Sequence, residues 1–457
     1  MKIALISRWY WEENRRFGED GGPVRQLAEA VAALGHEVVV LTQSPTRRLL
    51  KDKIGKLDAW IAPRDKRRDL ITALRDKFAK KAYKHRKIHT DALMLGDFLA
   101  KAGPFDVVWA QTEAPDGLAV GFAAQQLRIK MPPVLVQVQA LRYRFAKGAP
   151  IFVDKEPLGI AFRQATRIIA NSEMIAGALH NFGVSQEDYD LKVRVVYPNL
   201  QRTFLLAAQQ DPIHVTPMKD RVLFLGALNQ GKGALVFLKA LPKTEVSKRS
   251  SVFVVIGDFT ENNPRFEKAW EETKESTRIQ TLGARIEYLG HVSPFEVIRQ
   301  IRLARVVVIP SLYDAFSRAL IESLVLGRPV ITTDRVGAWP LVQAQQCGVV
   351  IPANDTDSLA HAIDVVLSPI VPFAENAAKI STRMAHEFSP EAIALQISYH
   401  LSRITGASPE AAHFGIQGPD QAPEPMPETM EHAPEPPPEP IEPASEQTPA
   451  HSEEKEW

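Results

Sequence analysis

The sequence predicts an α/β protein in which two doubly wound parallel-sheet domains follow each other along the chain. Short, continuously apolar segments alternate with segments of helical period, a pattern typical of parallel strands covered by helices on both faces. The pattern occurs in two series that meet near residues 205–218. The 457 residues, 45% of them hydrophobic, are sufficient for two or three domains, each with its own core.

The first series begins with an apolar strand, KIALIS, and a loop that contains GEDGGP. A helix is expected over residues 23–34, because Pro23 suits a first turn and Gly35 suits a C-terminal end. The strands expected after this helix are HEVVVLT, FDVVWAQT, PVLVQVQ, ATRIIANS and VRVVYPNL. The order strand, helix, strand is that of a parallel sheet.

The second series begins with RVLFLGAL at residues 221–228. Its further strands are expected at VFVVIGDF, IEYLGHV, RVVVIPSL, RPVITTD and GVVIPAN. Ser389 is expected to cap a last helix over residues 389–404. Because ligands of such sheets bind beyond the carboxyl ends of the strands, we expect the functional site in the cleft between the two domains.

The overall composition excludes several classes of protein. A formal net charge of +1 gives no argument for a nucleic-acid partner. The single cysteine, Cys347, excludes an internal disulfide framework and fits a reducing compartment. The sequence has no apolar run of about 18 residues, and its opening, MKIALISRWYWEE, has the pattern of a strand rather than a signal peptide. We therefore expect a cytoplasmic protein.

Charge is nevertheless distributed unevenly. Residues 46–90 hold 16 Lys or Arg against 5 Asp, and within them Leu70, Leu74 and Phe78 share one helical face. Two interpretations stay open: contact with an anionic partner or a membrane surface, such as the inner face of the cytoplasmic membrane, or a solvated helical insertion. Residues 408–457 hold 12 Pro and 12 acidic residues against one Lys, which predicts a disordered tail. We hypothesise that this tail screens the basic segment.

The stretch SLYDAFSRALIE, residues 311–322, combines two carboxylates with a helix start. Asp314 is expected in a loop after an apolar strand, and Glu322 just over a turn inside the following helix. Amide groups near Ser317 and Arg318 can bind a phosphate, while carboxylates accept hydrogen bonds from hydroxyls. The spacing therefore suits a nucleotide-sugar. The simplest alternative is a loop aspartate with a surface glutamate.

With its flanks IPSLYDAF and ESLVLGRPVITTD, this stretch resembles the E-x7-E motif of the retaining GT-B glycosyltransferases of group 1, family 4. The resemblance implies transfer of a sugar from a nucleotide-sugar to an acceptor hydroxyl with retention of anomeric configuration. It also implies catalysis without a metal or cofactor. Glu322 matches the ribose-binding glutamate, and Asp314 matches the first glutamate with a shorter side chain. Phe316 and Ser317 lie in the matching donor-binding stretch.

The first domain and the start of the second carry further matches. Gly21 and Gly22 resemble the family's Gly-Gly loop, whose small residues let the backbone approach the donor phosphates. FLGALNQGKGALVFL resembles the family's G-R-x4-K-G, in which Lys232 would bind the leaving diphosphate. Gly226 and Gly233 are the glycines of that pattern.

The arginine of that pattern is replaced by Ala227, a change that removes a cation worth several kcal/mol of transition-state stabilisation. Arg318 either compensates for this loss or is an exposed helix residue. The stretch also satisfies most of a P-loop, G-x4-G-K. Gly233 lacks the hydroxyl that would bind Mg²⁺ there, which disfavours an ATPase.

Other positions depart from the family pattern. Gln139 stands where many relatives carry a histidine near the reacting sugar, and Leu341 replaces a glutamate. Trp9 and Trp11 follow the first strand, where they would stack on an acceptor sugar or simply pack. These departures leave open a catalytically degenerate GT-B scaffold protein. A nucleotide-sugar epimerase is less favoured, because its own motifs are not evident.

No metal site is predicted. The D-x-D sequences at residues 188–190 and 355–357 are expected in loops and are interpreted as structural, the second as a helix cap. No pair among the 12 histidines has the spacing of metal ligands, and no Ser-His-Asp set is legible.

We therefore expect an acceptor-side domain over residues 1–204, a nucleotide-sugar-binding domain over residues 205–388, and a crossover helix over residues 389–407 that packs on the first domain. The expected catalytic residues are Lys232, Asp314 and Arg318. The expected substrates are a UDP-, GDP- or ADP-linked sugar and a glycan or lipid-linked acceptor, in bacterial polysaccharide or glycolipid assembly.

Overall fold

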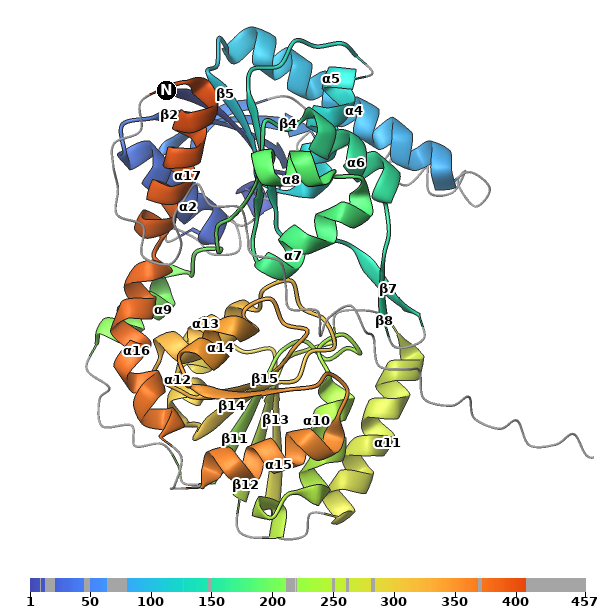
Figure 1. Ribbon diagram of the computed structural model, residues 1–457, viewed down its shortest axis with the longest axis vertical. Helices are drawn as coiled ribbons and strands as arrows, with labels where there is room; N and C mark the ends of the chain where they lie inside the picture. Colours follow the sequence, from blue (N-terminus) through green and yellow to red (C-terminus); the bar gives the residue numbers. More distant parts are fainter. Residues whose placement is uncertain are drawn as a thin grey trace, which may run out of the picture.

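The computed structural model consists of two α/β domains stacked along the long axis of the molecule (Figure 1). The residues that the structure describes are 1–8, 10–12, 21–44, 50–63, 80–125, 127–146, 149–210, 218, 220–248, 251–259, 263–280, 284–368 and 372–407. Trp9, residues 18–20 of the GEDGGP stretch and the acidic tail lie outside these residues. Across the described ranges, no helix is long and apolar enough to cross a membrane.

The N-terminal domain is built on a sheet with the strand order β10-β9-β6-β5-β1-β2-β4-β3. All neighbouring strands in this sheet are parallel except β3 and β4. Its strands are β1 Lys2–Ile6, β2 Glu37–Ser44, β3 Leu50–Ile54, β4 Leu57–Pro63, β5 Val107–Ala110, β6 Val134–Val138, β9 Arg167–Ala170 and β10 Val193–Val195. The central strands are fully buried, which matches their continuous apolar sequences.

Helices cover both faces of this sheet (Figure 1). They are α2 Pro23–Ala33, α4 Lys80–Ala102, the π-helical turn η2 Glu113–Gly117, α5 Leu118–Gln125, α6 Lys155–Gln164, α7 Glu173–Ala178, η3 Leu179–Phe182 and α8 Gln186–Lys192. As predicted, Pro23 begins α2, and Gly35 follows its C-terminal end with a positive φ of 88°. The expectation of a loop at residues 188–190 was wrong, because these residues lie within α8, where Ser185 caps the helix.

The basic segment 46–90 is not a purely helical insertion, and this expectation was wrong. Its described part includes β3 and β4, which extend the sheet beyond β2. Trp60 and Ile61 of β4 are buried in the core. Strand β4 therefore forms because it buries these apolar side chains when it pairs with the edge of the sheet. Leu70, Leu74 and Phe78 lie outside the described residues, and α4 begins at Lys80.

The C-terminal domain has a parallel sheet with the strand order β13-β12-β11-β14-β15-β16. Its strands are β11 Arg221–Leu225, β12 Ser251–Ile256, β13 Ala284–Gly290, β14 Val306–Ile309, β15 Val330–Thr333 and β16 Gly348–Ile351. Its helices are α10 Ala234–Ala240, η4 Leu241–Lys243, η5 Val246–Lys248, α11 Pro264–Gln280, α12 Pro294–Leu303, α13 Arg318–Val325, α14 Trp339–Ala344 and α15 Thr356–Leu367. Asp355 caps α15 by accepting from two backbone amides, as predicted.

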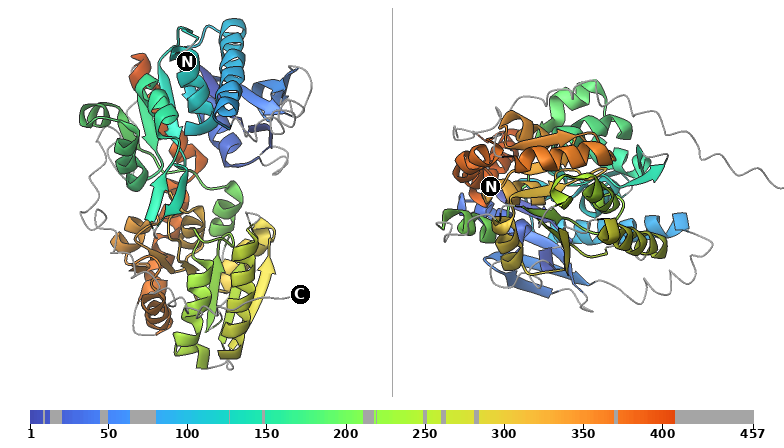
Figure 2. Two further views of the ribbon diagram at one scale, coloured as in Figure 1. Left: turned by 90° about the vertical axis from the view of Figure 1, so that its right-hand side faces the viewer. Right: turned by 90° about the horizontal axis from the view of Figure 1, so that it is seen from below.

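Three helices join the domains along one side: α9 Arg202–Gln209, α16 Phe373–Glu387 and α17 Pro390–Thr405 (Figures 1 and 2). The boundary expected between residues 204 and 205 falls inside α9, whose Phe204 packs with the C-terminal core. Ser389 caps α17, as predicted. Ile393 and Ile397 of α17 pack with residues of the N-terminal sheet and α2. The chain therefore returns to the first domain after completing the second.

A hairpin of two antiparallel strands, β7 Tyr143–Ala146 and β8 Ala149–Phe152, projects from the N-terminal domain toward the C-terminal domain (Figures 1 and 2). We call it the interdomain hairpin. Its Phe145 packs against the core cluster of the C-terminal domain. This contact places N-terminal residues at the carboxyl edge of the second sheet.

Candidate active site

The loops that follow β11 and β14 meet because these strands are neighbours in the sheet. The amide of Leu312, in the second loop, donates to the carbonyl of Gly231 in the first loop over 2.8 Å. Gly233 has φ +69°, and a Cβ at this position would lie 1.8 Å from the carbonyl oxygen of Pro310. Only glycine therefore permits this approach, which explains the absence of a P-loop hydroxyl at position 233.

The approach of the two loops brings Lys232 to Asp314. The Lys232 Nζ donates to the Asp314 carboxylate over 2.5 Å, and the side chains are 33% and 14% exposed. The Asp314 loop is itself fixed, since the Asp314 amide donates to the Arg335 carbonyl and the Gly337 amide donates to the Asp314 carbonyl. Two sequence-predicted residues 82 positions apart therefore form one charged pair.

Glu322 lies on α13, and among the described residues its carboxylate has no hydrogen-bond partner. Burial raises the pKa of Glu322 to about 7, and the nearby Arg318 guanidinium partly offsets this rise. A half-buried carboxylate whose oxygens are not bonded to the protein can accept hydrogen bonds from two hydroxyls of a ligand. Arg318 is exposed at the start of the helix.

The two residues before α13 have different roles from each other. Phe316 is 3% exposed and packs between Tyr197 and Phe388, so its ring stabilises the core and does not face the cleft. Ser317 is buried and adopts φ 75° and ψ 90°, an uncommon conformation for a residue with a side chain. Such strain is typical of functional loops.

The other predicted glycines are Gly21 and Gly22, before a helix, and Gly226, after a strand. Gly22 precedes α2, and the Gly21 carbonyl accepts from the Gln26 side chain over 3.1 Å. A Cβ on Gly21, which has φ +66°, would lie 2.6 Å from the Arg25 side chain. Gly226 follows β11, and a Cβ there would have no neighbour closer than 3.7 Å.

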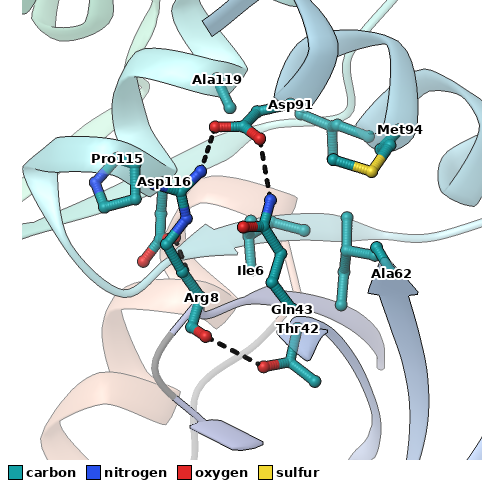
Figure 3. A pocket seen from close by; sticks show the side chains of 12 residues that line it. Ile6, Arg8, Thr42, Gln43, Ala62, Asp91, Met94, Pro115, Asp116 and Ala119 are labelled. Atoms are coloured by element: carbon teal, nitrogen blue, oxygen red, sulfur yellow. Dashed lines mark hydrogen bonds and ion pairs between the residues drawn. The ribbon is translucent and has the colours of Figure 1, made fainter. Parts of the chain in front are cut away.

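The N-terminal domain contributes a polar cluster that the sequence did not reveal. Arg8, after β1, pairs with Asp91 of α4, and the Gln43 side chain donates to the same carboxylate over 2.8 Å (Figure 3). The Arg8 amide donates to Asp116 over 3.1 Å, and Thr112 donates to its other oxygen over 2.8 Å. Burial raises the pKa of Asp116 to about 7. These residues line a small pocket at the carboxyl ends of β1, β2 and β4.

A second buried carboxyl fixes the loop after β6. Glu113 accepts from the amide of Gln139 over 3.0 Å, and burial raises the pKa of Glu113 to about 7. The Gln139 side chain donates to the Gln111 carbonyl over 3.5 Å, so Gln139 sits at this loop in a fixed orientation. Trp11 packs against the core shared by the sheet, α2 and α17.

Two contacts hold the domains against each other beside Asp314. The Ser172 hydroxyl, at the start of α7, donates to the Ala315 carbonyl over 2.6 Å. The Tyr143 hydroxyl of the interdomain hairpin donates to the Tyr313 carbonyl over 3.3 Å, and the two rings lie 4.5 Å apart. The loop that carries Asp314 is therefore in contact with the N-terminal domain on both flanks.

Within the part of the chain that the structure describes, no three His, Cys, Asp or Glu side chains are arranged to hold a metal ion. The predicted residues of the C-terminal domain form two pairs: Lys232 contacts Asp314, and the Arg318 guanidinium lies near Glu322 on α13. Leu341, which replaces the family's glutamate, packs against the C-terminal core.

Comparison with known proteins agrees with this arrangement. Residues 219–368 match the family described as "Glycosyl transferases group 1", and residues 23–197 match the "Glycosyl transferase 4-like domain". An uncharacterized glycosyltransferase of Methanocaldococcus jannaschii is 28% identical over 158 residues, which is 34% of this chain and 38% of that protein. The alpha-D-kanosaminyltransferase of Streptomyces kanamyceticus is 27% identical over 266 residues, 55% of this chain and 65% of that protein.

These alignments span less than two thirds of either relative. Solved structures resemble the chain over a greater length. One is "Trehalose-6-phosphate from E. coli bound with UDP-2-fluoro glucose", with a TM-score of 0.66 and 10% identity, over 90% of this chain and all of that one. The fold is thus GT-B, two facing parallel-sheet domains. The chain belongs to the group 1 glycosyl transferases.

Proposed function

We propose that the protein transfers a sugar from a nucleotide-sugar donor to an acceptor hydroxyl with retention of anomeric configuration. One observation carries the proposal: at the carboxyl edge of the second sheet, Lys232 contacts Asp314, while the half-buried Glu322 on the next helix has no hydrogen-bond partner among the described residues. A cation for a diphosphate and a carboxylate for a ribose are thereby held on adjacent elements.

In this proposal each residue has a separate role. Glu322 accepts hydrogen bonds from the hydroxyls of the donor ribose. The strained backbone of Ser317 orients the amide groups at the start of α13 toward the diphosphate. Lys232 stabilises the charge on the leaving diphosphate, assisted by Arg318. Asp314 accepts a hydrogen bond from a hydroxyl of the transferred sugar. It also holds the Lys232 ammonium in position until the donor phosphate binds Lys232 in its place.

The reaction breaks the bond between the anomeric carbon and the phosphate oxygen and forms a bond to the acceptor oxygen on the same face. The departing phosphate oxygen takes the acceptor proton, as the resemblance to retaining relatives implies. No protein base is needed for this step. The contacts of Ser172 and Tyr143 with the Asp314 loop close the cleft, which limits reaction of the donor with water.

The acceptor is proposed to bind the N-terminal domain. Around Arg8, Asp91 and Asp116, the carboxyl edge of the first sheet carries donors and acceptors of hydrogen bonds, although the pocket between them, about 30 Å³, is too small to enclose a sugar ring. Gln139 faces the same edge from β6. A glycan or lipid-linked acceptor in bacterial polysaccharide assembly is the class that we propose.

A non-catalytic GT-B scaffold is the second candidate. Ala227 supplies no cation, and Lys232 is engaged by Asp314 in the structure. Such a protein would keep the fold and the unpaired Glu322 without turning over a donor.

Thermal unfolding with UDP, GDP, ADP, CMP and ATP, each with and without Mg²⁺, tests the proposal. A ligand at about 100 times its dissociation constant adds about 2.7 kcal/mol of stability. We expect one nucleoside diphosphate to stabilise the wild type and to lose its effect in Glu322→Gln. The matched control is Glu375→Gln, an exposed carboxylate on α16.

Release of the nucleoside diphosphate from the matching nucleotide-sugar then separates enzyme from scaffold. Turnover abolished by Lys232→Ala supports transfer. Stabilisation by a nucleotide without turnover of any donor favours the scaffold, and absence of any stabilisation contradicts both candidates.

A further inference from the structure

A cavity of about 650 Å³ lies between the interdomain hairpin and the C-terminal domain. Its N-terminal wall includes Tyr143 and Phe145 of the interdomain hairpin. Its C-terminal wall includes Gly231, the residue before Lys232, and Phe266 of α11. The volume lies within the range of about 300–1,000 Å³ that is usual for small-molecule sites.

Aromatic rings form part of both walls. The rings of Tyr143 and Phe145 lie 5.3 Å apart at an angle of 81°, so they present differently oriented faces. Phe266 is half-buried and contacts Phe259 edge to face, with 6.3 Å between the ring centroids. Aromatic faces pack against the apolar C–H surface of a sugar ring.

Carboxamides supply the polar part of the C-terminal wall, through Asn229, Gln230 and Asn263. The Asn229 oxygen accepts from the Lys232 amide over 2.9 Å, and the Asn263 oxygen accepts from the Phe266 amide over 3.2 Å. These bonds fix the orientation of both side chains. The exposed Gln230 and Asn263 carboxamides each carry two donors, which suit sugar hydroxyls.

Charge is nearly absent from the lining. Arg142 is the one charged residue among the described lining residues, and it pairs with Asp154 over 2.8 Å. The described walls therefore offer no carboxylate for a ribose or a cation, and no unpaired cation for a phosphate. This chemistry selects a neutral, hydroxylated ligand over a nucleotide or an acidic sugar.

We propose that this cavity is a carbohydrate subsite that holds a neutral sugar unit of the acceptor, beyond the unit that carries the reacting hydroxyl. The inference rests on the proposed function, because the cavity borders the Lys232 loop and half of it comes from the acceptor-side domain. The subsite exists only when the interdomain hairpin lies against the second domain. Binding of an extended acceptor thus favours the closed cleft.

The test is retention of the labelled full-length protein on an array of immobilised neutral and uronic-acid-containing oligosaccharides. Phe266→Ala removes one wall, and Gln230→Glu places a carboxylate at an exposed edge where folding is not disturbed. The matched control is Phe295→Ala, a 75% exposed ring on α12 that does not line the cavity. Loss of one stacking ring weakens binding by about tenfold.

We expect the wild type and Phe295→Ala to retain neutral oligosaccharides and Phe266→Ala to retain about tenfold less, while Gln230→Glu is expected to reduce retention of uronic-acid-containing glycans more than that of neutral ones, because its carboxylate repels theirs. Preference for uronic acids, no retention of any neutral glycan, or equal retention by all variants would overturn the subsite. Stabilisation by nucleoside diphosphates, measured on the same preparations, keeps the two proposals apart. If the nucleotide stabilises the wild type but no neutral glycan is retained, the subsite fails and the proposed function survives.

Discussion

Replacement of Glu322 by glutamine is expected to stabilise the free protein while weakening its donor site. Burial raises the pKa of Glu322 from 4.5 to about 7, so the folded state holds a proton that the unfolded state has released between these values. The contribution of this group to stability therefore falls as the pH rises from about 4.5 to about 7. Glutamine has the same shape and carries no charge, so it escapes that loss.

The expected gain in unfolding free energy follows from the pKa values of Glu322 in the unfolded and folded states. A pKa rise from 4.5 to about 7 corresponds to a loss of about 3 kcal/mol of unfolding free energy above neutral pH. This is an upper estimate, because Glu322 keeps some solvent contact. At about pH 5 the folded carboxyl is protonated, and the advantage of glutamine falls below about 1 kcal/mol.

Urea denaturation of the wild type, Glu322→Gln and Glu375→Gln at about pH 8 and about pH 5 measures this difference. We expect Glu322→Gln to be more stable than the wild type at the higher pH and nearly equal to it at the lower pH. The exposed Glu375→Gln serves as the control and is expected to lie at or slightly below the wild type at both, by less than about 1 kcal/mol, because Glu375 only complements the dipole of the first turn of α16. A destabilised Glu322→Gln at about pH 8, or a gain that does not depend on pH, would show that burial of Glu322 does not raise its pKa.

Three further predictions concern the loops around the site. Gly233→Ala is expected to lose about 2–4 kcal/mol of unfolding free energy, because its Cβ would lie 1.8 Å from the Pro310 carbonyl, whereas Gly226→Ala is expected to unfold at nearly the wild-type urea midpoint. Ser172→Ala is expected to lose about 1–2 kcal/mol, measured in the same way, because it removes both the bond to the Asp314 loop and the cap of α7; an unchanged midpoint would contradict the interdomain contact. Asp116→Asn is expected to raise the urea midpoint more at about pH 8 than at about pH 5, since burial raises the pKa of Asp116 to about 7, and the reverse order would contradict that burial.

The local order of strands and helices could be predicted because it depends on neighbouring residues. The second series of strands, the cap at Ser389 and the start of α2 at Pro23 are confirmed. The strand around Trp60 was missed because its short apolar run lies within a stretch that was interpreted from its many basic residues. The interdomain hairpin was missed because its strands are short and their partner surface belongs to the other domain.

The candidate site could be predicted only in part, because it depends on contacts between residues that are distant in sequence. The sequence indicated Lys232, Asp314 and Glu322 one by one, through local motifs, but not that the first two form an ion pair. Phe316 lies within the motif, yet its ring packs with Tyr197, which is distant in sequence. The contacts among Arg8, Asp91 and Asp116 join positions 83 and 108 residues apart, so no local pattern signals them.

Isothermal titration of the full-length protein with the nucleoside diphosphates tests most directly whether Glu322 forms part of a nucleotide site. We expect one of them to bind with one-to-one stoichiometry near neutral pH. Its affinity is expected to fall about tenfold in Glu322→Gln, to be unchanged in Glu375→Gln, and to weaken below about pH 7 as the Glu322 carboxyl takes up its proton. Equal affinity in all three proteins, or no binding of any nucleoside diphosphate, would rule out a donor site at Glu322.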